Sequence, residues 1–326
     1  MADIPLYVIP IVGREISDVV PELESDNDIF YKKVDTVKDF KNSDVNFFLK
    51  DKKDDISLSY KLLIWEKVEK SGGVENFTEY FSGLCNALCT KEAKSSIAKH
   101  FSLWKSYADA DIKNSENKFI VVIEDDNTLK DSIIIHNIII EMQEKNIDIF
   151  QLRETFHNSN SRILFNQENN NFMYSYTGGY DFTLSAYVIR LSSAIKIINE
   201  IIKNKGISTS LSFEMYKLEK ELKLNRQVLN DSSKYILHNT KYLSKKRANE
   251  MKNGIWNRVG KWMAHRFPDF SYYVSHPLVS FFGIFDISII GALIILFIII
   301  MIIFNLNSKL LWFLAGMLST VFTYIV

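Results

Sequence analysis

The stretch from Phe119 to Asn127 reads FIVVIEDDN, and it decides the predicted fold. Its first five residues are apolar and mostly β-branched, without the polar alternation of a strand that faces water on one side. A continuous run of this kind is typical of a strand buried on both faces, as in a parallel sheet covered by helices. Three carboxylates follow directly, at Glu124, Asp125 and Asp126. The stretch therefore predicts a buried strand with an acidic turn at its carboxyl end.

The segments around this strand alternate between strand and helix patterns, with a polar, charge-rich stretch early in the chain that predicts a loop with short elements. The predicted strands are 6–12, 119–123, 147–152, 172–176, 183–190 and 226–229, and the predicted helices are 92–108, 132–145, 192–203 and 213–222. Such alternation predicts an α/β fold with a mainly parallel central sheet covered on both faces. In these sheets ligands bind beyond the carboxyl ends of the strands, which is where the acidic turn lies.

Two apolar runs close the sequence and predict a membrane anchor. The run from Ile287 to Phe304 has no charged residue, and a second run, 310–326, follows a short polar break. About 20 apolar residues at about 1.5 Å each cross a bilayer, so the first run is long enough to span. The second run fits either a return span or an interfacial segment. We therefore divide the chain into an α/β domain (1–240), a basic juxtamembrane segment (241–285) and a C-terminal anchor with one or two spans (286–326).

The two ends of the sequence also predict an orientation. The N-terminal residues MADIPL have no basic stretch before an apolar core, so they do not form a secretory signal. An anchor at the C-terminus that inserts after translation leaves the main domain on the cytosolic side. Many basic residues precede the first apolar run and only Lys309 follows it, which agrees with the positive-inside bias.

Charge is unevenly distributed along the chain. The formal net charge is zero, which gives no signal for nucleic-acid binding. From Lys217 to Arg266, however, there are thirteen Lys or Arg residues against four acids, a charge of about plus nine. Such a segment attracts polyanions or acidic lipid headgroups. A solvated flank beside the membrane is an equally good interpretation.

The chain has two cysteines, Cys85 and Cys89. Their spacing places them on one face if the segment is helical. No second cysteine pair or nearby histidine completes a zinc site. Buried free thiols are the default expectation, and a local disulfide is the alternative.

The acidic turn is a candidate metal site. Three adjacent carboxylates repel one another, and a hard divalent cation such as Mg²⁺ or Mn²⁺ relieves that repulsion. Glu124 and Asp126 would point the same way if the chain stays extended. Glycosyltransferases use such an acidic-x-Asp pair to hold a metal against the diphosphate of a nucleotide sugar. Acidic triplets also occur in ordinary solvated loops.

A helix with His100 and Trp104 precedes this strand, and the combination resembles the glycosyltransferases of lipooligosaccharide and collagen modification. This resemblance implies that a UDP-sugar binds next to the acidic turn. The metal ligands would be Glu124, Asp126 and a histidine late in the chain. The acid on the acceptor side would come from the predicted helix 213–222, and the sugar pocket would lie near the pair of glycines at 178 and 179. The residues so implied are Asp125, Gly178, Gly179 and Tyr180 for the nucleotide sugar, Glu214 for catalysis and His238 for the metal. The alternative interpretations are that His100 is an ordinary core or surface histidine, that Trp104 only packs against other side chains, and that Gly178 and Gly179 form a hairpin.

A second resemblance covers nearly the whole chain. It rests on the motifs FSGLCNALCT (81–90), YTGGYD (176–181), LSAY (184–187), NRQ (225–227), SFFGIFD (280–286) and SKLLWFL (308–314). The chain resembles the poxvirus immunodominant envelope proteins that bind heparan sulfate. This resemblance implies a glycosyltransferase type A-like fold associated with nucleotide-sugar binding. It also implies a tail anchor in the virion membrane, a domain on the virion surface, and roles in attachment and assembly.

These observations leave three functional hypotheses. The first is an attachment protein that binds heparan sulfate or a related glycosaminoglycan through the basic residues Lys241, Lys245, Lys246, Arg247, Lys252, Arg258 and Lys261. The second is a metal-dependent glycosyltransferase that uses a UDP-sugar, which a cytosol-facing domain does not favour. The third is a structural envelope protein that contacts other virion envelope proteins, which is compatible with the first. Because fold does not determine function, we favour binding over turnover.

Overall fold

The structure is a computed structural model of the 326-residue chain. It describes residues 4–20, 32–34, 47–50, 57–82, 85, 89, 91–110, 115–130, 133–154, 175–179, 182–208, 211–229, 232–238, 279–281, 285–287, 289–305 and 308–316. The seven basic residues assigned to heparan sulfate, from Lys241 to Lys261, lie outside the described residues, and so does Tyr180.

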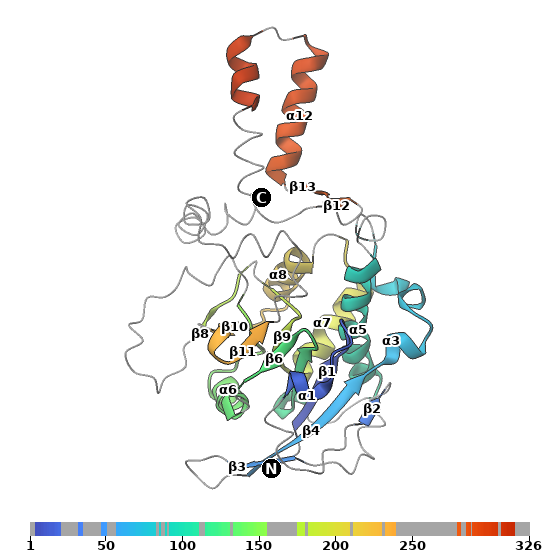
Figure 1. Ribbon diagram of the computed structural model, residues 1–326, viewed down its shortest axis with the longest axis vertical. Helices are drawn as coiled ribbons and strands as arrows, with labels where there is room; N and C mark the ends of the chain where they lie inside the picture. Colours follow the sequence, from blue (N-terminus) through green and yellow to red (C-terminus); the bar gives the residue numbers. More distant parts are fainter. Residues whose placement is uncertain are drawn as a thin grey trace, which may run out of the picture.

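A nine-stranded sheet forms the centre of the domain, in the order β2-β4-β1-β5-β9-β7-β10-β8, with β3 paired to β4 (Figure 1). Six strands (β2, β4, β1, β5, β7 and β10) run in one direction, and β3, β8 and β9 run in the other. The predicted α/β class with a mainly parallel sheet is therefore confirmed. The strands are β1 (Ile4–Ile9), β2 (Lys32–Val34), β3 (Phe47–Lys50), β4 (Ser57–Trp65), β5 (Phe119–Glu124), β7 (Ile149–Gln151), β8 (Ser175–Thr177), β9 (Ala186–Arg190) and β10 (Arg226–Leu229).

Helices lie on both sides of this sheet. The α-helices of the domain are α1 (Ile16–Val19), α3 (Lys67–Lys70), α5 (Lys91–Asp109), α6 (Ile133–Glu144), α7 (Leu191–Lys203) and α8 (Leu211–Glu221). Single 3-10 turns lie between the helices and strands: η2 (Val74–Asn76), η3 (Thr78–Tyr80), η4 (Ser115–Asn117) and η5 (Ser232–Lys234). A separate two-stranded ribbon joins β6 (Asn127–Leu129) to β11 (Ile236–His238).

The central strands contribute alternate side chains to two cores. On β5, Ile120 and Val122 pack in one core with α5 and α7, whereas Val121 and Ile123 pack in the other with α6. Every residue from Phe119 to Ile123 is buried, as the continuous apolar run predicted. Successive side chains of a strand point to opposite faces, so a strand covered on both sides must be apolar throughout.

Most predicted elements appear with bounds shifted by a few residues, and the strand at 226–229 appears unchanged. The central strand β4 was missed, although it pairs with β1, β2 and β3. Its sequence, SLSYKLLIW, mixes polar and apolar residues and follows a charge-rich stretch. The hairpin alternative for the glycine pair is wrong, because β8 pairs with β10 and β9 pairs with β5 and β7.

The C-terminal region carries β12 (Val279–Phe281) paired with β13 (Phe285–Ile287), and α12 (Ile289–Ile303). The predicted span therefore begins at Ile287, the last residue of β13, and ends at Phe304, directly after α12. A second helical stretch, 309–316, lies beside α12 (Figure 1). Across the part of the chain that the structure describes, no helix has both the length and the apolar character needed to cross a bilayer. The membrane anchor therefore stays a prediction.

Candidate functional site

The candidate site lies where two neighbouring parallel strands end. Ile9 at the end of β1 pairs with Glu124 at the end of β5. The chain then turns at Asp125 and Asp126 before β6 begins. An extended chain through Asp126 was the condition for Glu124 and Asp126 to point the same way, and it is not met, because β5 ends at Glu124. The three acidic side chains consequently contact three different parts of the protein.

Glu124 contacts helix α5. Ser96 Oγ donates a hydrogen bond to Glu124 Oε1 over 2.8 Å, and His100 Nε2 lies 3.4 Å from the same oxygen. The other ring nitrogen of His100 is 2.9 Å from the hydroxyl of Tyr187 on β9. His100 is fully buried, so the three residues form an internal chain of carboxylate, imidazole and phenol.

The surroundings of Glu124 favour its ionised form. Burial by itself raises the pKa of Glu124, but the hydrogen bond and charge of His100, the Ser96 hydroxyl and the charge of Arg153 outweigh burial and lower that pKa below its usual value. Burial raises the pKa of Tyr187 well above its usual value, and the negative charge of Glu124 adds to this effect. At neutral pH Glu124 is therefore a carboxylate and Tyr187 a neutral phenol.

Asp125 holds the loop that follows β1. Its Oδ1 accepts hydrogen bonds from the backbone N–H groups of Ile11 and Val12, at 2.7 and 2.9 Å. Its Oδ2 accepts from those of Gly13 and Arg14, at 2.7 and 3.0 Å. The side chain is about 1% exposed, so the carboxylate faces this loop and not solvent.

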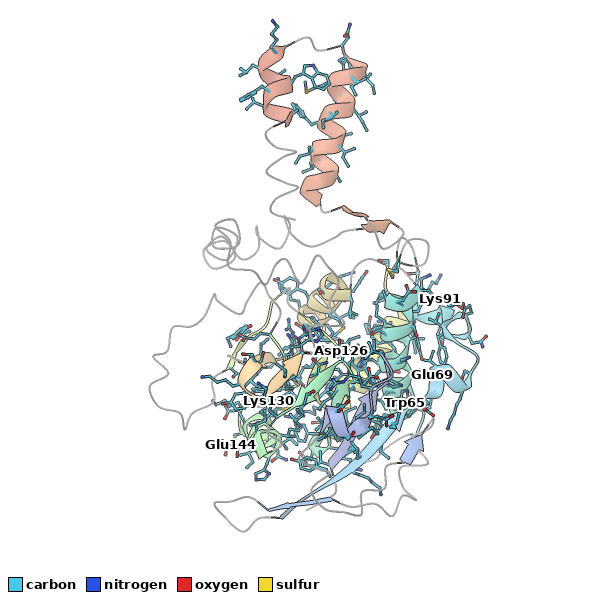
Figure 2. All side chains as sticks on the ribbon, in the orientation of Figure 1. Trp65, Glu69, Lys91, Asp126, Lys130 and Glu144 are labelled. Atoms are coloured by element: carbon cyan, nitrogen blue, oxygen red, sulfur yellow. A yellow bond between two sulfur atoms is a disulfide. The ribbon has the colours of Figure 1, made fainter. Side chains whose placement is uncertain are left out.

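Asp126 lies beside the β6–β11 ribbon (Figure 2). Pairing of β11 with β6 puts His238 opposite Asn127, which places His238 Nδ1 3.5 Å from Asp126 Oδ2 and 3.4 Å from Asn127 Oδ1. Asn127 Nδ2 also donates to Asp126 Oδ1 over 2.5 Å. The structure thus brings His238 to the acidic turn, although more than one hundred residues separate them.

The geometry around the turn bears on metal binding. Among the described residues, there is no group of three or more His, Cys, Asp or Glu side chains placed to hold a metal ion. Glu124 contacts α5, whereas Asp126 and His238 contact each other. Binding of Mg²⁺ or Mn²⁺ by Glu124, Asp126 and His238 stays a prediction, as does a nucleotide-sugar role for Asp125.

One residue of the glycine pair, Gly178, has a packing role in this structure. A Cβ added to Gly178 would lie 2.3 Å from the guanidinium carbon of Arg226, whereas one added to Gly179 would meet nothing within 4 Å. Arg226 is about 2% exposed and donates from Nε to Glu219 over 2.7 Å and from Nη1 to Gln151 over 3.0 Å. Gly178 therefore makes room for a buried ion pair, and its predicted role beside a nucleotide sugar is not tested by this arrangement.

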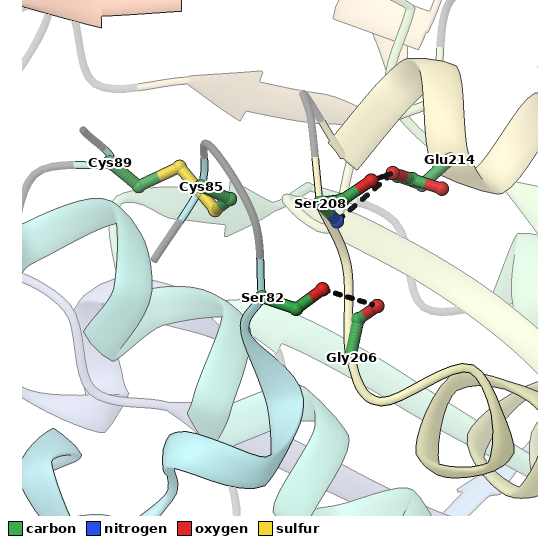
Figure 3. The surroundings of a disulfide bond; sticks show 6 residues. All are labelled: Ser82, Cys85, Cys89, Gly206, Ser208 and Glu214. Atoms are coloured by element: carbon green, nitrogen blue, oxygen red, sulfur yellow. Dashed lines mark hydrogen bonds between the residues drawn. A yellow bond between two sulfur atoms is a disulfide. The ribbon is translucent and has the colours of Figure 1, made fainter. Parts of the chain in front are cut away.

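Glu214 lies in the first turn of α8 and faces Ser208 (Figure 3). Its Oε1 accepts hydrogen bonds from the backbone N–H and the hydroxyl of Ser208, at 3.0 and 2.7 Å. Cys85 and Cys89 form a disulfide, so the default expectation of free thiols is wrong and the alternative is confirmed. Glu214 thus stabilises the loop that enters α8, and its catalytic role stays a prediction.

Sequence reasoning missed a polar network that joins the turn to the neighbouring strands. Asn127 is fully buried, and its amide donates to the carbonyl and hydroxyl oxygens of Ser185, at 3.1 and 2.9 Å. Arg153, just past β7, donates to the same hydroxyl over 2.6 Å. The signal that could have found these residues is their place beside strand ends: Arg153 lies just past the end of β7, and Ser185 lies just before the start of the antiparallel strand β9, so both lie at the edge where β5 ends.

Comparison with known proteins identifies the family and several relatives of the chain. The family described as "Poxvirus P35 protein" matches residues 1–326. The chain is 38% identical to "Envelope protein H3" of variola virus and to that of vaccinia virus (strain Copenhagen), in each case over 98% of both chains. It is also 32% identical to the "Immunodominant envelope protein p35" of fowlpox virus over 73% of this chain and 72% of that protein.

Proposed function

The chain belongs to the poxvirus P35 protein family, and from this premise we propose that it is a virion envelope protein that attaches the particle to cell-surface heparan sulfate. The proposed protein is held in the virion membrane by its C-terminus, with its main domain on the virion surface, and it contributes to assembly beside other envelope proteins. The names of its relatives support the envelope role. The observation that carries the proposed ligand is the basic block between Lys217 and Arg266.

The C-terminal helices support the anchor. Helix α12 contains no charged residue, and its sequence is IIGALIILFIIIMII. Large apolar side chains along this region are exposed to between 40% and 70%: Leu293, Ile295, Leu296, Ile299, Ile300, Ile302, Ile303, Phe304, Leu310, Trp312, Phe313 and Leu314. Burying a side chain of this size in an apolar environment gains about 1.5–3 kcal/mol. A lipid environment is the natural way to cover so many of them.

The described part of the basic block supports a surface for polyanions. Lys217, Lys220 and Lys223 lie on or just after α8, and all three are exposed. Arg226 belongs to the block in sequence only, because it is buried against Glu219. Heparan sulfate is a dense polyanion, so its binding releases counterions and weakens steeply with salt, as for other polyelectrolytes.

The test is elution of the full-length protein, in detergent, from immobilised heparin. Neutralising Lys245, Lys246 and Arg247 to Gln should lower the salt needed for elution and reduce the slope of log K against log salt by about 2–3, by analogy with the slope per neutralised phosphate in DNA. A matched control neutralises three exposed lysines elsewhere, Lys145 just after α6 and Lys196 and Lys203 on α7. If both triple variants elute alike, binding depends on net charge or on another surface, and the proposed segment is wrong.

We propose that the domain is a glycosyltransferase type A-like scaffold that binds rather than turns over a nucleotide sugar. The strand order, with the reversed strand β9 between β5 and β7, supports the scaffold. The contacts of the acidic turn favour the absence of turnover, because Glu124, Asp125 and Asp126 each interact with protein groups. The full-length protein should release no UDP from a panel of UDP-sugars with Mg²⁺ or Mn²⁺. Release that Asp126→Ala abolishes would instead establish the glycosyltransferase alternative.

A further inference from the structure

The disulfide joins one buried and one partly buried cysteine. Cys85 is about 2% exposed and belongs to the core that includes Tyr80 and Phe81. Cys89 is only partly buried and packs against the edge of that core. A thiolate from outside the protein therefore reaches Cys89 more easily than Cys85, and thiol–disulfide exchange depends on which cysteine is accessible.

The partly buried cysteine also lies just before the N-terminus of a helix. Cys89 is two residues before α5, a helix of 19 residues. The unpaired N–H groups and the dipole at the N-terminus of a helix stabilise nearby negative charge. Reactive cysteines in proteins occupy partly exposed, electropositive places of this kind, whereas buried cysteines are inert.

The buried cysteine is held in place independently of the disulfide. Cys85 N–H donates to Ser208 O over 2.9 Å, and Ser82 N–H donates to Ile207 O over 2.9 Å. Ser82 Oγ also donates to Gly206 O over 3.3 Å (Figure 3). Gly206 has φ +90°, and a Cβ there would lie 2.4 Å from Phe81 N, so the two segments are in close backbone contact. These contacts keep Cys85 beside Cys89 after the bond opens, ready to close it again.

We propose that Cys85 and Cys89 form a thiol–disulfide exchange site, at which Cys89 forms the mixed disulfide with a dithiol partner and Cys85 resolves it. In reduction, a thiolate of the partner attacks Cys89 Sγ, the Cys85–Cys89 bond breaks, and Cys85 leaves as a thiolate that takes a proton from solvent. The second thiolate of the partner then attacks its own sulfur in the mixed disulfide and releases Cys89. The partner loses two electrons and becomes a disulfide, and the protein gains two thiols. Oxidation is the reverse sequence.

The experiment uses the full-length protein in detergent, reduced with dithiothreitol and freed of it. Glutathione disulfide is added, the reaction is stopped with acid at short times, and peptides are mapped by mass spectrometry. The wild-type protein should carry glutathione transiently on Cys89 and then recover the Cys85–Cys89 bond. In Cys85→Ser the glutathione adduct should persist, and in Cys89→Ser the adduct on Cys85 should form at least about 10-fold more slowly, since a buried thiol is unreactive.

Two results would overturn the proposal. One is an adduct that forms on Cys85 as fast as on Cys89 in the wild-type protein. The other is no adduct on either cysteine in the time in which a free peptide of residues 81–91 reacts. Near-ultraviolet circular dichroism checks that each variant is folded, and the wild-type map decides the question by itself if a variant is not.

Discussion

Asp125 offers the sharpest test of how the acidic turn is built. Its carboxylate accepts four backbone hydrogen bonds from the loop that follows β1, at 2.7, 2.9, 2.7 and 3.0 Å. A hydrogen bond to a charged group contributes about 1.5–3 kcal/mol, so four would total about 6–12 kcal/mol if they were additive. Ile11 in this loop is 37% exposed, and water can satisfy part of the freed N–H groups. We therefore expect Asp125→Ala to destabilise the protein by about 3–5 kcal/mol.

Asp125→Asn keeps the shape of the side chain and removes its charge. The amide oxygen can still accept from Ile11 and Val12, but the amide nitrogen would face the N–H groups of Gly13 and Arg14, donor against donor. Two hydrogen bonds are lost and two donors are left opposed, so we expect a loss of about 2–4 kcal/mol. The matched control is Asp126→Asn, one residue along, where the side chain is less buried; we expect a change of about 1 kcal/mol or less.

The assay is urea unfolding of the full-length protein in detergent, followed by tryptophan fluorescence at neutral pH. The order of the free energy of unfolding should be wild type, then Asp126→Asn, then Asp125→Asn, then Asp125→Ala. Equal losses for Asp125→Asn and Asp126→Asn would refute the reasoning, because they would show that the loop does not depend on the Asp125 carboxylate.

Three further predictions concern the neighbouring contacts. Because the pKa of Glu124 is lower in the folded state, its ionised form stabilises the protein above its unfolded pKa, and this stability is lost as pH falls through the folded pKa. Acid unfolding of Glu124→Gln should therefore show a weaker pH dependence below about pH 5. An unchanged profile would contradict the lowered pKa of Glu124. Gly178→Ala should lower the melting temperature, because the new methyl group meets the Arg226 guanidinium, whereas Gly179→Ala should have little effect. Similar melting temperatures for the two variants would argue against the close approach of Arg226 to Gly178. Arg226→Ala leaves Glu219 buried without its cation and should cost about 3–5 kcal/mol in chemical unfolding, and a loss below about 1 kcal/mol would mean that the pair is solvated.

Local patterns were enough to predict the elements that have a regular period. The run FIVVI predicted β5 because a strand buried on both faces has no polar position. Helical spacing predicted α5, α6, α7 and α8 within two residues at each end. The first six residues of β4, SLSYKL, alternate between polar and apolar, which is a strand signal that was missed next to the charge-rich stretch. The place of β4 next to β1 depends on pairing partners far away in the chain.

The sequence by itself determined the α/β class, the position of the acidic turn after a buried strand, the uneven charge and the family to which the chain belongs. Only the tertiary structure decided what the side chains of the turn contact. Glu124 meets Ser96 and Asp125 meets the loop after Ile9 because β5 pairs with β1 and packs under α5. These partners are between 28 and 114 residues away in sequence. A local pattern records the burial that each residue needs, whereas the partner that satisfies a polar group is determined by how distant segments pack.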